Sequence, residues 1–135
     1  LGFRLIDNGK RPLERFLAND CFTVGESEFA QLLDSAEGQT PFLTMEYHGG
    51  DERSIDCLAH EGQLVRAVVR RKPASSHWRW QIIEDDPEAW DIARRAVTAF
   101  RLHGLVNVQT RERIEPDGRR QQCFLEVNPR MSGGL

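Results

Sequence analysis

Two segments in which polar and apolar residues alternate, 105–113 and 121–128, flank the tetrapeptide Glu115-Pro116-Asp117-Gly118. Proline fixes the backbone early in a turn, while aspartate and glycine favour the conformations that reverse the chain. Alternation with a period of two is typical of strands that bury one face. The pattern therefore predicts an antiparallel hairpin and commits the C-terminal part of the chain to a β-sheet.

The rest of the chain predicts further strands together with helices, and so an α+β fold. A second hairpin is expected from 53–59 and 64–71 around His60-Glu61-Gly62-Gln63, with more strands at 1–6 and 42–47. Helices are expected at 12–18, at 27–36 and after Asp86-Pro87, where Trp90, Ala93, Val97 and Phe100 form one apolar stripe that ends before Gly104. No linker or repeat interrupts the chain, so we expect a single domain over residues 1–135.

The predicted C-terminal hairpin brings several oxygen-bearing side chains together. Gln109 shares one strand face with Asn107, and Glu126 shares another with Phe124 and Asn128. Any register that pairs Gln109 with Phe124 or Glu126 places the amide beside the carboxylate. Carboxylate and amide oxygens are hard ligands of the kind that Mg2+ prefers. The hairpin therefore predicts a magnesium site, although polar alternation is also found on any solvated strand.

Just beyond the predicted ligands, Arg130 carries a planar guanidinium that can grip a phosphate with two parallel hydrogen bonds. On another predicted strand, Arg66, Arg70 and Lys72 alternate on one face. They predict binding of a triphosphate or an anionic substrate, or else a charged strand edge that resists aggregation. Lys72 is our candidate for a nucleotide phosphate.

Composition excludes several other classes of protein. The 18 basic and 21 acidic residues give a net charge of −3, so no global field attracts nucleic acid or an anionic membrane. Three scattered cysteines do not suggest a disulfide framework or a zinc cluster. The chain has no long apolar run and no signal peptide, so we expect a cytoplasmic protein without a membrane or nucleic-acid partner.

The order of these motifs resembles the ATP-grasp superfamily, specifically the carbamoyl phosphate synthetase large subunit and related carboxylate-amine ligases. Asn107-Val108-Gln109 followed by Leu125-Glu126-Val127-Asn128-Pro129-Arg130 is similar to the closing hairpin of that family. The resemblance implies that Gln109, Glu126 and Asn128 hold Mg2+, or Mn2+, against ATP. It also implies that Arg130 contacts the reacting phosphate.

Upstream, the segment from Met45 to Asp56 is similar to the nucleotide hinge of the same family. The resemblance implies that the backbone around Glu46, Tyr47 and His48 binds adenine and that Glu52 holds the ribose. Gly2-Phe3-Arg4 resembles the end of the glycine-rich phosphate loop. We therefore expect residues 1–135 to be one partial domain, the C-terminal lobe of an ATP-grasp unit.

The implied reaction uses ATP to activate a carboxylate as an acyl phosphate, which an amine or another nucleophile then attacks. A fragment of such an enzyme is expected to be inactive alone. A homodimer is one assembly that we consider. Two alternatives stay open: a non-catalytic nucleotide-binding or partner-binding module of the same fold, and a nucleic-acid binder that uses Trp78 and Trp80 beside Arg70, Arg71 and Lys72.

Overall fold

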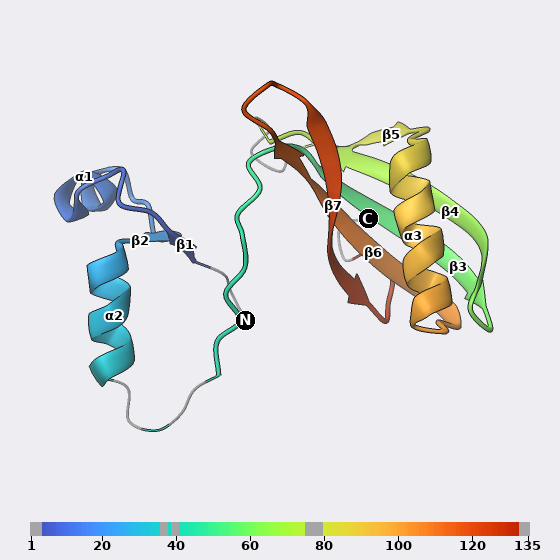
Figure 1. Ribbon diagram of the computed structural model, residues 1–135, viewed down its shortest axis with the longest axis horizontal. Helices are drawn as coiled ribbons and strands as arrows, with labels where there is room; N and C mark the ends of the chain where they lie inside the picture. Colours follow the sequence, from blue (N-terminus) through green and yellow to red (C-terminus); the bar gives the residue numbers. More distant parts are fainter. Residues whose placement is uncertain (1–3, 36–37, 39–40, 75–79, 133–135) are drawn as a thin grey trace. The chain divides into compact units, whose positions relative to one another are not determined.

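The computed structural model describes residues 4–35, 38, 41–74 and 80–132. Gly2, Phe3 and Trp78, which the sequence singled out, lie outside these ranges. The chain divides into two compact units, residues 1–47 and 48–135 (Figure 1). Helices and a largely antiparallel sheet confirm the predicted α+β class. That both units form one partial domain stays a prediction.

The first unit is built from two short strands and two helices. They are β1 (Leu5–Ile6), α1 (Pro12–Leu17), β2 (Thr23–Val24) and α2 (Glu26–Ser35). Strands β1 and β2 are parallel, with Leu5 opposite Thr23. Helix α1 begins at a proline, which suits the first helical position, and Glu14 accepts a hydrogen bond from the Arg11 backbone N–H at 3.0 Å. Both predicted helices are confirmed.

Residues 42–47 are not a strand, and this prediction was wrong. The segment belongs to neither a helix nor a strand, and Phe42, Leu43 and Met45 are more than half exposed. An apolar run becomes a buried strand only where a neighbouring strand offers a free edge, and none of the described strands pairs with this segment. Phe42 instead packs edge-on against Phe29 of α2, with ring centroids 5.9 Å apart.

The second unit contains a five-stranded sheet in the order β5-β4-β3-β6-β7, with every described pair antiparallel. Its elements are β3 (Glu52–His60), β4 (Gln63–Lys72), β5 (Ile82–Glu84), α3 (Pro87–Ala99), β6 (Gly104–Ile114) and β7 (Arg120–Asn128). Both predicted hairpins are confirmed. Helix α3 covers one face of the sheet (Figure 1).

The hydrophobic core lies between α3 and this face of the sheet. Asp86 caps α3 by accepting a hydrogen bond from the Ala89 N–H at 3.0 Å, as the sequence predicted. Val97 of α3 and Val108 of β6 are fully buried, and burial of each stabilises the fold by about 1.5–3 kcal/mol. The rest of the core is formed by small or branched residues: Ile55, Cys57, Ala59, Val69, Ala89, Ala93, Ala96 and Val106.

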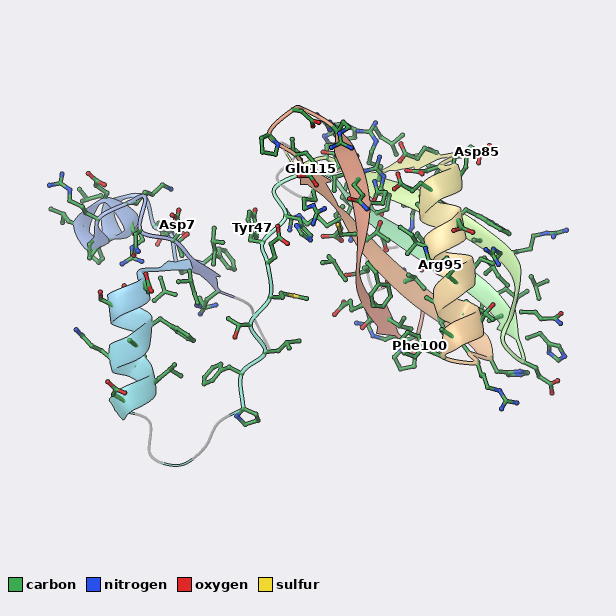
Figure 2. All side chains as sticks on the ribbon, viewed as in Figure 1. Asp7, Tyr47, Asp85, Arg95, Phe100 and Glu115 are labelled. Carbon is green, nitrogen blue, oxygen red and sulfur yellow. The ribbon has the colours of Figure 1, made fainter. Side chains whose placement is uncertain are left out.

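The predicted stripe on α3 is only half correct. Ala93 and Val97 are buried, whereas Trp90 and Phe100 are 40% and 61% exposed. The buried face is rotated toward alanines because their small side chains let the helix approach the sheet closely. Phe100 lies at the C-terminal end of α3 (Figure 2) and contacts Phe124 of β7, with ring centroids 6.4 Å apart. None of the described helices is long and apolar enough to cross a membrane.

The opposite face of the sheet carries polar and charged side chains from four neighbouring strands. Strand alternation and the observed registers place many of them there, and nine lie around the predicted site: Glu52, Ser54, Asp56, Arg70, Lys72, Asn107, Gln109, Glu126 and Asn128. We refer to these nine residues as the polar face. It contains every predicted metal ligand together with Glu52 and Lys72, and the site is therefore built from it.

Candidate functional site

The register of β6 and β7 unites the three predicted metal ligands. Gln109 is directly opposite Glu126, and Asn107 is directly opposite Asn128, so all four side chains point to the same face. This is one of the two registers that the sequence predicted. The amide of Gln109 and the carboxylate of Glu126 are thus neighbours across the hairpin.

A β-bulge at Leu125 changes the face of the residue before it. Gln109 pairs with Glu126 while Thr110 pairs with Phe124, which leaves Leu125 as the extra residue of β7. The prediction that Phe124 shares a face with Glu126 was therefore wrong. Phe124 lies on the α3 side, where it meets Phe100. The bulge therefore lies between Phe124 and the end of β7 that carries the predicted ligands.

The three predicted ligands offer oxygen atoms and are at least partly accessible. Glu126 is exposed, and Gln109 and Asn128 are half-buried. The Asn128 Nδ2 donates to Glu126 Oε1 at 2.8 Å, which orients the Asn128 amide beside the carboxylate. The described residues contain no group of three histidine, cysteine or acidic side chains suited to a metal. One carboxylate with two amides nevertheless fits Mg2+, which keeps several waters and uses few protein carboxylates.

A buried network lies at the centre of the polar face. Asp56 forms an ion pair with Arg70 and accepts a hydrogen bond from Asn107 Nδ2 at 2.9 Å. The same Asn107 nitrogen donates to Ser54 Oγ at 3.0 Å. Asn107 is fully buried, and no donor among the described residues reaches its Oδ1. These hydrogen bonds hold Asn107, and therefore the part of β6 next to Gln109, in one conformation.

Sequence reasoning did not assign a site role to this network. It grouped Asp56 with the hinge motif and Arg70 with the charged strand, and noted Asn107 only as a neighbour of Gln109. A signal was present in β3, where Glu52, Ser54 and Asp56 alternate and must share one face. Pairing that alternation with Asn107 and Gln109 of β6 would have found the cluster.

Glu52 and Lys72 form a second pair on the same face. They are directly opposite across β3 and β4, and Lys72 Nζ lies 2.8 Å from Glu52 Oε1. Both side chains are largely buried, with 15% and 16% of their area exposed. Each charge therefore holds the other in place. The ribose role of Glu52 and the phosphate role of Lys72 stay predictions, but the two residues do lie together.

The hinge segment is attached to β6 at its end. Gly50 N–H donates to Glu112 O at 3.1 Å, and Asp51 N–H donates to Glu112 Oε2 at 3.2 Å. A Cβ atom at Gly50 would lie only 2.5 Å from Glu112 Cβ, so the close approach requires glycine. Glu46 and Tyr47 belong to the first unit and His48 to the second. The adenine-binding role of these three residues stays a prediction.

Ion pairs support the hinge from the α3 side of the sheet. Arg53 pairs with Glu84 at 3.0 Å and with Glu112 at 2.5 Å. Arg71 pairs with Glu84 at 2.7 Å and with Asp51 at 2.9 Å. Burial raises the pKa of Asp51, but hydrogen bonds from the Ala74 N–H and from Arg71 outweigh this effect, so the pKa lies below its ordinary value.

Arg130 is exposed immediately after the predicted ligands. Its Nη1 donates to the Met131 carbonyl at 3.0 Å. Two residues later, the chain returns to the polar face, where the Ser132 N–H donates to Asp56 Oδ1 at 3.1 Å. The segment that carries Arg130 is therefore fixed at both ends, by β7 and by Asp56.

A groove in the described part of the protein lies on the other face of the sheet. It has a volume of about 630 Å3 and is lined by Ala96 and Phe100 of α3 and Phe124 of β7. These residues are on the α3 side of the sheet, opposite Gln109, Glu126 and Asn128. The groove is apolar and contains none of the predicted ligands, so we do not assign the site to it.

Comparison with known families adds an independent result. The family described as "ATP-grasp in the biosynthetic pathway with Ter operon" matches residues 38–135, which includes the hinge, the polar face and the segment with Arg130. Among curated proteins and solved structures, none matches the chain.

Proposed function

The chain belongs to the ATP-grasp family described for the biosynthetic pathway with the Ter operon, and from this we propose that it is the metal-binding lobe of an ATP-dependent ligase. The proposed enzyme requires Mg2+ and activates a carboxylate as an acyl phosphate. The observation that carries the proposal is the placement of Gln109, Glu126 and Asn128 side by side on the polar face.

In the proposed reaction, a carboxylate oxygen attacks the γ-phosphorus of ATP and ADP leaves. An amine then attacks the acyl carbon and phosphate leaves, so a C–N bond forms, as in the carbamoyl phosphate synthetases that the sequence resembles. Reactions of this kind depend mainly on positioning and on neutralisation of phosphate charge. Mg2+, when bound, supplies part of that neutralisation.

Different residues of the chain would bind the metal, the phosphates, the ribose and the base. Gln109, Glu126 and Asn128 would hold the metal, and Arg130 would pair with the phosphate that is transferred. Lys72 would neutralise phosphate charge, and its ion pair with Glu52 would orient the carboxylate that binds the ribose. Glu46, Tyr47 and His48 would supply the backbone that holds the base. An amine acceptor, a homodimeric assembly and a cytoplasmic location belong to the same proposal.

Titration calorimetry with Mg-ATP tests the proposal on the chain itself. We expect wild type to bind Mg-ATP and Glu126→Gln to bind it at least about tenfold more weakly, because the only carboxylate among the three ligands is lost. Glu115→Gln makes the same chemical change in the turn of the same hairpin, 11 positions earlier in the sequence, and should bind like wild type. Equal affinity of Glu126→Gln and wild type would contradict the proposal.

A further inference from the structure

The segment after β7 is bound back to the centre of the sheet through one carboxylate. Ser132 N–H donates to Asp56 Oδ1 at 3.1 Å, although the two residues are 76 positions apart in the chain. We propose that Asp56 is a positioning residue, which holds residues 129–132 and thereby sets the place of Arg130. The consequence for phosphate binding rests on the proposed function, whereas the attachment itself does not.

Asp56 accepts hydrogen bonds on both of its oxygens. Asn107 Nδ2 and Ser132 N–H donate to Oδ1, at 2.9 Å and 3.1 Å, and Arg70 donates to Oδ2. Asp56 is only 8% exposed and Arg70 only 6% exposed, so water replaces these partners poorly. The donors come from β6, from β4 and from the segment after β7. One side chain therefore connects three parts of the second unit.

Only a carboxylate can satisfy this arrangement. An asparagine at position 56 would have to direct its NH2 group either at Arg70 or at Asn107 and Ser132, and all three are donors. The charged guanidinium is the stronger donor, so the amide oxygen should turn toward Arg70. The NH2 group would then face the Ser132 N–H and release it. Asp56→Asn is thus expected to detach the segment while Arg70 keeps an acceptor.

Amide hydrogen exchange measured by NMR on the full chain tests the attachment. We expect the Ser132 amide to exchange roughly tenfold faster in Asp56→Asn than in wild type, because its hydrogen bond to Asp56 is lost. Ser54→Ala is the matched control: it removes an acceptor of the same Asn107 but leaves the Asp56 carboxylate, which accepts from the Ser132 N–H, in place. This variant should leave the exchange of Ser132 unchanged.

Two outcomes would overturn the attachment. One is unchanged exchange of Ser132 in a folded Asp56→Asn. The other needs no variant and holds even if that substitution prevents folding: a wild-type Ser132 amide that exchanges as fast as in an unstructured peptide. Both measurements are made without nucleotide, so they do not depend on the proposed function.

The functional consequence is tested by comparing Mg-ATP with Mg-ADP. If Arg130 contacts the phosphate that only ATP carries, Asp56→Asn should reduce the preference for ATP over ADP by about tenfold. A purely structural role would weaken both nucleotides equally, and that result would overturn the positioning role. Failure of wild type to bind either nucleotide would instead contradict the proposed function and leave the exchange result standing.

Discussion

A methyl group at residue 50 tests how the hinge segment is held against the sheet. Gly50 contacts Glu112 so closely that a Cβ atom would lie 2.5 Å from Glu112 Cβ and 2.8 Å from its carbonyl oxygen. Ordinary contacts begin near 3.4 Å, so Gly50→Ala must displace the segment by about 1 Å. Neither atom is the end of a flexible side chain, and the displacement therefore falls on the backbone.

The Glu112 N–H also donates to the Asp51 carbonyl at 2.9 Å, but the displacement acts mainly on the three longer hydrogen bonds at this point. They are Gly50 N–H to Glu112 O at 3.1 Å, Asp51 N–H to Glu112 Oε2 at 3.2 Å, and Arg111 Nε to Gly50 O at 3.2 Å. Their loss costs about 1 kcal/mol each. Alanine also restricts the unfolded chain, which returns about 0.4–1 kcal/mol. We therefore expect Gly50→Ala to lower the free energy of unfolding by about 2 kcal/mol.

Urea unfolding followed by tryptophan fluorescence measures this change in the right unit, because all three tryptophans fall within residues 48–135. The midpoint should decrease while the slope stays unchanged. The reasoning is refuted if Gly50→Ala is as stable as wild type or gains the stability expected from alanine alone.

Two further predictions follow from altered pKa values. Asp51→Asn should lower the free energy of unfolding at pH 7, and the difference from wild type should shrink below about pH 4. The reason is that a carboxyl with a lowered pKa stabilises the folded protein only while it is ionised. Denaturation curves at pH 7 and below pH 4 test this, and a difference that persists in acid would contradict it. Burial raises the pKa of the Cys57 thiol to about 12, so at pH 8 iodoacetamide should modify exposed Cys21 but spare Cys57, as mass spectrometry can check.

The hairpins were predictable because local signals determine them. Alternation and the Pro-Asp-Gly turn predicted β6 and β7, and the register with Gln109 opposite Glu126 was among those expected. The bulge at Leu125 was not predictable. The amino acids of β7 are equally compatible with a regular strand and with a strand that contains one extra residue. The bulge places Phe124 against Phe100 on the α3 side, and this contact between distant residues is not visible in the local sequence.

Tertiary partners decided the two other errors. The run 42–47 has the composition of a buried strand, but a strand also needs a neighbour with a free edge, which local sequence cannot reveal. On α3, Trp90 and Phe100 fit the helical period as well as Ala93 and Val97 do. Which face of α3 packs on the sheet depends on how closely the helix can approach it, and the face with the alanines allows the closer approach.

The composition of the polar face is itself an argument for function. Asp56 and Arg70 are as inaccessible as many core residues, and such a pair is often no more stabilising than apolar residues of similar volume, because both charges must lose their water. On the α3 side of the same sheet, the part that packs against the helix is an apolar core of valine and alanine, and the buried Arg53–Glu112 pair lies at its end near the hinge. Stability alone therefore does not account for the charges. A role in holding Ser132 and the amides beside Gln109 does, since it requires directed hydrogen bonds that apolar side chains cannot make.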